Sequence, residues 1–471
     1  MNTRPQFASS TPLSKLPPQI YYVHPLMLKG LQDWRQVFAH AKDLGFDTVL
    51  SAPLFARGAD TSIFVSGDLD RLDPALGLGE SVDDGVKALT GAAKEHGIKL
   101  MLDIAIDRIA DASNQGSAVV FDPRRSPQES GSRTIDITHE TQLLDDWRRR
   151  LARLAGLGIA GFRCIGIGKV APDVWKGLIT AARSAVSDTI FLAWTPGTSF
   201  EDRKALKGVG FDGSFSSFAW WNMEERWILD EYEVQRELGY QITFPEAPFG
   251  KRMAHGIDGT EVSERRAVRA LKLASTFASG LMVPMGFEYG SSIPLDPLTG
   301  DGMGLRGLKD QGVFDLSSDI RAINAAPNKT SAGFGRQPLR LISTSQTQAV
   351  ALLQTDHEDI RASSKIRVVM LNRDLRRVTK APFNVLREAA SPFLPLTAPG
   401  NDADIFAPDL MLKPGELRVF EGHASQPIIE AVPVSTAAEA AATPRLAIEK
   451  ITPSVDDGRF VVKRVVGETV K

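Results

Sequence analysis

Residues 161–170 read GFRCIGIGKV, and the apolar run around them, IAGFRCIGI at 159–167, has the length and composition of a buried β-strand. A helical pattern precedes it. Residues 140–158, ETQLLDDWRRRLARLAGLG, place Leu and Trp at three- and four-residue spacing and then stop at glycine. A helix that leads directly into a buried strand is typical of a parallel sheet built from βα units.

The same alternation of apolar run and helical pattern extends over the first three hundred residues. Seven further runs have the character of strands: IYYVHPL (20–26), FDTVLSAPL (46–54), IKLMLDIAI (98–106), TIFLAWTPG (189–197), FDGSFSS (211–217), YQITFPEA (240–247) and GLMVPMGFEYG (280–290). Eight strands with helices between them predict an α/β fold, a closed (β/α)8 TIM barrel, over residues 18–335.

Two segments depart from the barrel pattern. Residues 107–139, after the third strand, are rich in Ser, Gly, Pro and charge, and we expect them to form a short inserted loop domain over the C-terminal face of the barrel. Residues 336–423 contain the β-type runs LRLIST, AVALLQT, KIRVVMLNR and GELRVFEG, which predict a C-terminal antiparallel β domain.

The two ends of the chain have a different character. Residues 1–17 are predicted to be a flexible N-terminus, and the Ala- and Pro-rich residues 424–443 a linker. Residues 444–471 resume a strand pattern with an Asp-Gly turn but are too short to bury a core, so they look like the start of a truncated domain. The chain could therefore be part of a longer polypeptide.

Composition limits the classes of partner. Hydrophobic residues make up 43% of the 471 residues and charged residues 24%, with a formal net charge of −2, which argues against nucleic acid and anionic membrane as partners. The single cysteine, Cys164, excludes an intramolecular disulfide, fits a reducing compartment and is expected to be structural. Without a secretory signal or a run of about 20 apolar residues, we expect a cytoplasmic protein. We also expect a homo-oligomer.

Four segments at the ends of predicted strands carry a recurring order of residues: MLDIAIDR (101–108), GFRCI (161–165), FLAWTPG (191–197) and FPEAPFGKR (244–252). Together they resemble the α-amylase superfamily, glycoside hydrolase family 13. Within it, the likeness is closest to bacterial α-1,4-glucan:maltose-1-phosphate maltosyltransferases and the amylase-like modules associated with them. The resemblance covers residues 18–423, and the tail from Arg445 resembles the opening of the N-terminal β-sandwich of such a maltosyltransferase.

The resemblance implies where the catalytic groups would lie. In the family the fourth strand reads Gly-Phe-Arg-x-Asp, with Lys or His four residues beyond. Here Arg163 and Lys169 match, but Ile165 stands at the nucleophile. The fifth strand presents the general acid, a glutamate, where this chain has Trp194.

The seventh and third strands also depart from the family. The seventh carries His-Asp, replaced here by Pro248 and Phe249. The third ends in an aspartate followed by Asn and His, and this chain keeps Asp103 but has Asp107 and Arg108. The positions of the lost carboxylates are therefore Ile165, Trp194 and Phe249.

The replaced carboxylates are groups that the family's reaction requires. Retaining transfer at a glycosidic bond needs a nucleophilic carboxylate and a second carboxyl group as proton donor, about 5 Å apart. Isoleucine has no lone pair, and an indole cannot shuttle a proton near neutral pH. We therefore expect a catalytically inactive module in α-glucan metabolism that is fused to, or partners, a maltosyltransferase and could bind maltooligosaccharide. The alternatives are an active maltosyl-transferring or α-glucan-hydrolysing enzyme and a purely structural interaction domain.

The remaining residues of the vestigial site have alternative roles. Arg163 has lost its family partner, so we predict an ion pair with Asp103; otherwise its side chain would reach solvent at the barrel mouth. Glu246, like Asp107, could be a substitute catalyst, although a charged residue on the rim is the simpler interpretation. Trp194 either fills the old site or stacks on a sugar. His24, at the end of the first strand, is a candidate sugar contact or a histidine with its hydrogen bonds satisfied.

Other candidates are expected to be structural. For Trp220 and Trp221, core packing is favoured over sugar binding. No group of His, Cys and Asp has the spacing of metal ligands, and no glycine-rich loop has the setting of a dinucleotide site. No metal or cofactor is predicted.

Overall fold

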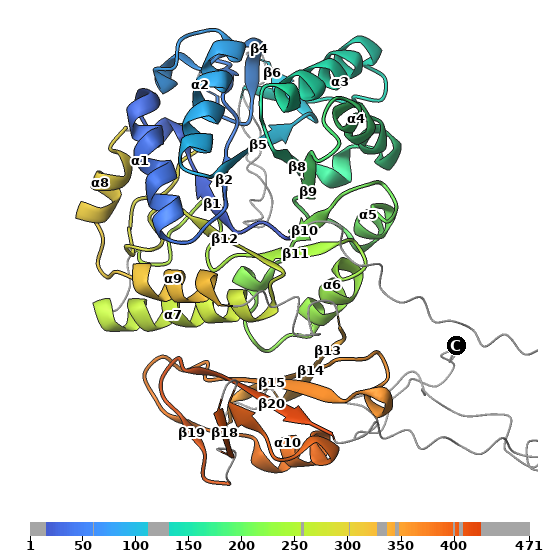
Figure 1. Ribbon diagram of the computed structural model, residues 1–471, viewed down its shortest axis with the longest axis vertical. Coiled ribbons are helices and arrows are strands. Elements are labelled where there is room, and N and C mark those ends of the chain that lie inside the picture. Colours follow the sequence, from blue (N-terminus) through green and yellow to red (C-terminus); the bar gives the residue numbers. More distant parts are fainter. Residues whose placement is uncertain are drawn as a thin grey trace, which may run out of the picture.

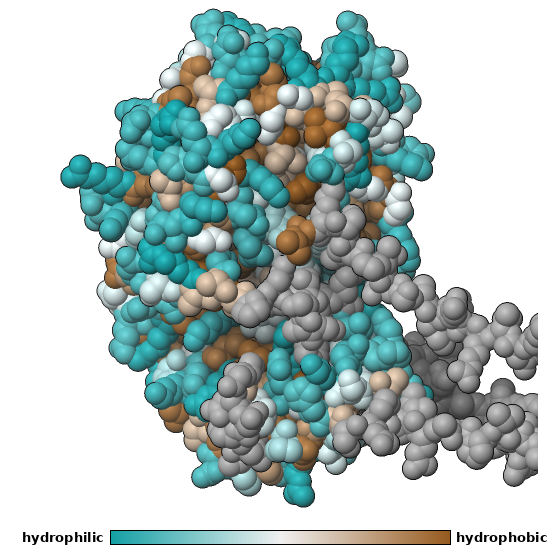
Figure 2. Space-filling model, in the orientation of Figure 1, coloured by the Kyte–Doolittle hydropathy of each residue, from teal (hydrophilic) through white to brown (hydrophobic). Residues whose placement is uncertain are grey.

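The computed structural model describes residues 16–59, 61–111, 131–255, 259–300, 302–326, 337–343, 348–398, 401–404 and 408–424. The predicted linker, the segment 444–471 and nearly all of the predicted flexible N-terminus lie outside these residues, so their extents stay predictions. The described residues contain no helix that is long and apolar enough to cross a membrane. On the face shown in Figure 2, hydrophilic side chains cover most of the surface and apolar ones lie between them in small groups.

Eight parallel strands close into a barrel, which confirms the predicted fold (Figure 1). Each of the eight apolar runs contains one strand. In chain order they are β1 (Ile20–Val23), β2 (Thr48–Ser51), β5 (Lys99–Ala105), β8 (Gly161–Ile165), β9 (Ile190–Ala193), β10 (Gly213–Phe215), β11 (Tyr240–Thr243) and β12 (Gly280–Pro284). The barrel closes where β1 pairs with β12. This closure brings residues from the first and last strands to the same interior.

Helices surround the barrel (Figure 1), and most of them bury apolar residues in its core cluster, whereas α6 buries its apolar residues in the cluster shared with the C-terminal sheet. They are α1 (Gly30–Asp43), α2 (Val82–Glu95), α3 (Thr141–Gly156), α4 (Pro172–Ala185), α5 (Phe200–Ala205), α6 (Trp227–Gln235), α7 (Thr260–Phe277), α8 (Gly304–Asp310) and α9 (Ser317–Ala325). Capping residues and a proline determine where several of these helices begin. The Ser81 and Ser199 side chains cap α2 and α5 by accepting backbone N–H groups, and α4 begins with a proline. The predicted helix at 140–158 is α3.

Two short hairpins follow the second and third barrel strands. β3 (Phe55–Arg57) pairs with β4 (Ser66–Leu72), and β6 (Arg108–Ala110) pairs with β7 (Ser132–Thr134). The second hairpin forms the described part of the predicted insertion, and residues 112–130 of that insertion lie outside the described residues.

The predicted C-terminal β domain is confirmed as a six-stranded antiparallel sheet. Its strand order is β13 (Leu339–Ser343), β14 (Val350–Thr355), β15 (Lys365–Leu371), β20 (Leu417–His423), β17 (Thr397–Ala398) and β18 (Asn401–Asp404). A small pair, β16 (Thr379–Lys380) with β19 (Met411–Leu412), and the helix α10 (Phe383–Ala389) complete the domain.

One buried apolar cluster joins the sheet to the barrel. It contains Phe218, Trp221, Ile228, Leu229, Tyr232, Leu273 and Phe277 from the barrel side, and Leu339, Val350, Leu352, Val369, Leu371 and Leu417 from the sheet. The Tyr232 hydroxyl donates to the Gln337 carbonyl and accepts from Gln354 Nε2, both at 2.9 Å. Trp221 is therefore a core residue, as expected. Trp220 is half-buried and packs edge-on against Trp194, with ring centroids 6.4 Å apart.

Gly161, the first residue of the motif on β8, tests how tightly the barrel is packed. A Cβ atom at this position would lie 2.3 Å from the Ile190 carbonyl oxygen on β9. We expect Gly161→Ala to lower the free energy of unfolding by about 1–3 kcal/mol, because backbone atoms must move apart. Urea unfolding followed by circular dichroism measures the change.

Gly91, an exposed residue inside α2, provides the matched control. A Cβ atom there meets nothing within 4 Å, so Gly91→Ala should raise stability by about 0.5–1 kcal/mol. Equal effects of the two substitutions would contradict the packing argument.

Candidate functional site

Asp103 and Arg163 form a buried ion pair inside the barrel. They occupy paired positions on the neighbouring strands β5 and β8, so their side chains leave the same face of the sheet. Arg163 Nε donates to Asp103 Oδ1 and Arg163 Nη2 donates to Asp103 Oδ2, both at 2.6 Å. Neither side chain is exposed. The predicted pair is confirmed, and the alternative, an arginine that reaches solvent, is wrong.

Aromatic rings enclose the guanidinium of this pair. Its carbon lies 4.7 Å from the centre of the Tyr22 ring, 4.8 Å from Trp194 and 5.3 Å from Phe215. The Tyr22 hydroxyl donates to Asp103 Oδ2 at 3.1 Å. We call Tyr22, Asp103, Arg163, Trp194 and Phe215 the Arg163 cluster. Ring faces attract a cation, so the rings partly replace the water that Arg163 has lost.

Burial and pairing oppose each other in the Arg163 cluster: burial raises the pKa of Asp103, although the charge of Arg163 works against that shift. Burial works against the charge of Arg163, but the Asp103 carboxylate outweighs it and holds the pKa of Arg163 above its usual value. Burial and the neighbouring Asp103 raise the pKa of the Tyr22 phenol well above its usual value. Tyr22 is therefore a neutral hydrogen-bond donor at physiological pH.

Apolar side chains are buried or half-buried at the three positions to which the resemblance assigns the family's carboxylates. Ile165 follows Arg163 by two residues on the same face of β8 and is 2% exposed. Trp194 is 6% exposed and stacks on Phe244, with ring centroids 5.3 Å apart. Phe249 is half-buried and packs edge-on against Phe64 and Tyr22 at centroid distances of 4.9 and 5.8 Å. Trp194 therefore fills space inside the barrel, and almost none of its surface is open to a sugar.

Asp107 follows β5 and belongs to a second ion-pair group. Arg108 donates to both oxygens of its carboxylate at 3.0 Å, and Lys169 Nζ lies 3.6 Å from Oδ2. Asp107 is fully buried, which corrects the expectation of an ordinary charged residue on the rim. Gly166 makes room for the group, because a Cβ there would lie 2.6 Å from the Asp107 carboxyl carbon. Buried charge requires such pairing.

Glu246 is also buried and paired, so it too departs from the expected exposed rim residue. Arg252 Nε lies 2.9 Å from Glu246 Oε1, and the Met253 backbone N–H donates to the other oxygen. Burial raises the pKa of Glu246, while the charge of Arg252 opposes that shift. Arg252 Nη1 in turn donates to the Met285 carbonyl at 3.1 Å, which fixes the pair to the segment after β12.

His24 lies beneath the segments that follow β12. Its Nε2 is 2.5 Å from the Asp296 carbonyl oxygen, and its backbone N–H points to Met285 Sδ at 3.3 Å. The residue is fully buried, and burial lowers the pKa of His24 to about 4. His24 is therefore neutral near pH 7 and, as placed here, is out of reach of a sugar at the surface.

The structure brings some of the predicted site residues together and separates others. Asp103, Arg163 and Trp194 share the Arg163 cluster, and Phe249 touches it through Tyr22. Asp107 with Lys169, Glu246 with Arg252, and His24 form three separate groups. Among the described residues, no three His, Cys, Asp or Glu side chains gather as metal ligands would.

Comparison with known proteins places this geometry in context. The fold is similar to that of an α-amylase from Lactobacillus plantarum, with a TM-score of 0.59, 17% identity and coverage of 86% of this chain and 98% of the other. An α-amylase from Malbranchea cinnamomea gives a TM-score of 0.58, 15% identity and coverage of 86% and 96%. The barrel and sheet domain have the α-amylase fold.

A relative that is similar in sequence gives information beyond the fold. Over an alignment 509 positions long, the chain is 30% identical to the α-1,4-glucan:maltose-1-phosphate maltosyltransferase of Burkholderia pseudomallei (strain K96243), with 99% of this chain aligned. Nearly the whole chain is similar to part of this maltosyltransferase. It spans 43% of that relative's length. Residues 444–471 match the family model for domain N/S of α-1,4-glucan:maltose-1-phosphate maltosyltransferase, on the segment set apart above as the start of a further domain.

Sequence reasoning missed several members of these groups. Tyr22 and Phe215 lie on β1 and β10, and only the closure of the barrel carries them to Arg163. The alternation of side chains along each strand indicates that they point inward, but not which residue they meet. Arg252 lies six residues after Glu246, a spacing that could have suggested the pair.

The ion pair of the Arg163 cluster predicts a large stability effect. Asp103→Asn would leave a buried arginine without its counter-charge, so we expect a loss of about 3–5 kcal/mol in the free energy of unfolding. Asp43→Asn, which removes an exposed partner of Arg321, should cost about 1 kcal/mol at most. Denaturant titrations of both variants measure the difference. A similar small loss for both would show that the buried charge is compensated in another way.

His24 predicts a pH dependence of stability. Its pKa is near 6.5 in the unfolded chain and about 4 in the folded protein, so the unfolded chain binds more protons as the pH falls below 6.5. Between pH 7.5 and pH 5 this proton uptake should lower the free energy of unfolding by about 2 kcal/mol. His24→Gln should remove that part of the pH dependence. Parallel stability curves for the two proteins would contradict the assignment.

Proposed function

We propose that this chain is a catalytically inactive amylase-like module that serves α-glucan metabolism beside a maltosyltransferase. The observation that carries the proposal is the filling of the catalytic positions. The resemblance assigns the nucleophile to the position of Ile165 and the acid to that of Trp194; both side chains are buried, and the Arg163 cluster lies in the barrel interior.

The acids that remain near these positions are committed to other partners. Asp103 is bound by Arg163, Asp107 by Arg108, and Glu246 by Arg252. A nucleophile must reach the anomeric carbon, and a general acid must hold a proton that it can give to the leaving oxygen. A buried carboxylate in an arginine ion pair does neither without first breaking the pair, at a cost of several kcal/mol.

The comparisons support the glucan part of the proposal. A named maltosyltransferase aligns with 99% of this chain, and the match at residues 444–471 falls on a domain of the same enzyme class. We infer that the module is fused to, or partners, such an enzyme in the cytoplasm. A homo-oligomer stays a prediction.

Glu246 favours a second candidate, an active maltosyl-transferring or α-glucan-hydrolysing enzyme. A buried carboxyl group with a raised pKa is what a general acid requires. Its ion pair with Arg252 counts against this role, because the cation favours the charged form that has no proton to give.

Activity assays separate the two candidates. The purified chain is incubated with maltoheptaose, with and without maltose-1-phosphate, and released phosphate and new chain lengths are measured. We expect no phosphate release and no change in chain length above an enzyme-free blank, because Asp103, Asp107 and Glu246 are each held in an ion pair with an arginine. A Glu246→Gln variant purified in parallel reveals contaminating enzyme. Turnover that this substitution abolishes would overturn the inactive assignment.

A further inference from the structure

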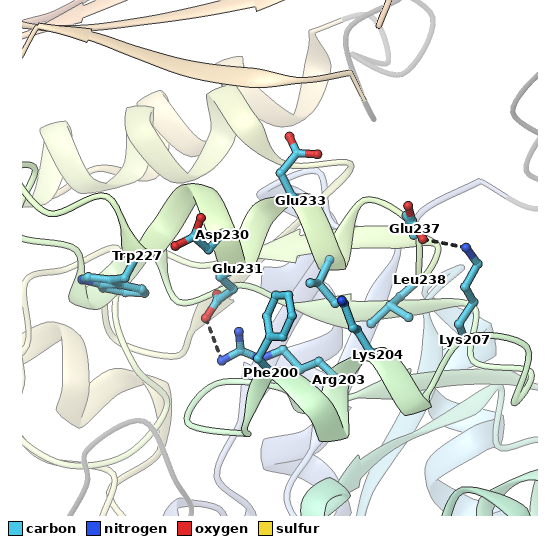
Figure 3. A pocket seen from close by; sticks show the side chains of 11 residues that line it. Phe200, Arg203, Lys204, Lys207, Trp227, Asp230, Glu231, Glu233, Glu237 and Leu238 are labelled. Carbon is cyan, nitrogen blue, oxygen red and sulfur yellow. Dashed lines mark hydrogen bonds and ion pairs between the residues drawn. The ribbon is translucent and has the colours of Figure 1, made fainter. Parts of the chain in front are cut away.

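A groove on the outside of the barrel has the make-up of a ligand site. It lies between α5 and α6, has a volume of about 680 Å3, and is lined by side chains from both helices and the turns after them (Figure 3). Small-molecule sites usually have volumes of about 300–1,000 Å3 and combine aromatic walls with a few fixed polar groups. None of the lining residues belongs to the Arg163 cluster.

Two aromatic side chains line this groove and keep part of their surface open to it. Trp227 also packs against the apolar cluster that joins the sheet to the barrel. Phe200, the first residue of α5, is 41% exposed, and Lys204 Nζ lies 4.4 Å from the centre of its ring. Trp227, the first residue of α6, is partly exposed, and its Nε1 donates to Glu225 Oε2 at 3.0 Å. The hydrogen bond restrains the indole ring, so less side-chain freedom is lost when a ligand stacks on it.

Two ion pairs order part of the polar lining of the groove, one buried and one exposed. Arg203 Nη2 lies 3.1 Å from Glu231 Oε2, and Lys207 Nζ lies 2.7 Å from Glu237 Oε2 (Figure 3). Glu231 also accepts the Ser217 backbone N–H at 2.6 Å. Ion pairs of this kind hold both donors and acceptors in defined positions.

The balance of charge indicates a neutral ligand. Three cations (Arg203, Lys204, Lys207) and four carboxylates (Asp230, Glu231, Glu233, Glu237) line the groove, which gives a formal charge of 3 − 4 = −1. A polyphosphate or nucleic acid would meet four carboxylates, and an apolar peptide helix would cover charged groups without replacing their water. A sugar has hydroxyl groups for both signs of charge and an apolar C–H face for the two aromatic rings.

We propose that the groove between α5 and α6 binds a segment of neutral α-linked glucan, with glucose units stacked on Phe200 and Trp227. The identity of the sugar rests on the proposed function, and the location of the site rests on the groove itself. The module would then hold glucan on its outer surface, although the positions inside its barrel are filled.

Calorimetric titration of the full chain with maltoheptaose tests this proposal. We expect binding by the unmodified chain and a loss of affinity of about tenfold or more in each of Phe200→Ala and Trp227→Ala, because each removes a stacking face. Phe200→Tyr keeps the ring and should keep affinity within about threefold. Val378→Ala, at a residue of the β domain that is 60% exposed, is the control for loss of exposed apolar surface and should bind like the unmodified chain.

Hydrogen exchange gives an independent measurement on the unmodified chain. Maltoheptaose should slow amide exchange in residues 200–207 and 227–238, and it should leave the strand β8 unchanged. Protection confined to other segments, unchanged affinity in both alanine variants, or no binding at all would overturn the site. The inactive assignment would survive each of these results, since only turnover bears on it, and turnover would leave a confirmed groove in place.

Discussion

The ion pair between Asp103 and Arg163 is the constraint that organises the barrel interior. Two full charges without solvent contact are tolerable only when each satisfies the other, and here two 2.6 Å hydrogen bonds do so. The arginine then needs surroundings that accept a cation, which the rings of Tyr22, Trp194 and Phe215 provide. A carboxylate at position 165 would compete for the same guanidinium. The apolar Ile165 leaves the guanidinium of Arg163 to the Asp103 carboxylate.

The same principle extends to the other charged groups near the mouth. Asp107 and Glu246 are each buried beside an arginine, so their negative charges are paired within the protein. Such pairs add little net stability compared with apolar packing, but they allow a single arrangement of side chains. Asp107 and Glu246 therefore take part in buried ion pairs within the barrel domain.

The sequence predicts almost the whole barrel but only part of the candidate site. Apolar runs and helical periodicity located all eight strands because each must be buried on both faces. The Asp103–Arg163 pair was predictable because it joins consecutive barrel strands. The aromatic partners were not, since Tyr22 reaches Arg163 only through closure of the barrel. The burial of His24 was equally hidden, because the cover comes from residues near Met285 and Asp296, some 260 to 270 positions later in the chain.

The apolar cluster between α6, α7 and the antiparallel sheet has a practical consequence for the architecture. Phe218 and Phe277 stack there with ring centroids 5.2 Å apart, and Val350 and Leu352 of the sheet are completely covered. A barrel without the sheet, truncated near residue 336, would expose this apolar surface to water and to other copies of itself. The barrel and the sheet domain should therefore unfold in one cooperative transition, and neither should be stable when it is produced alone.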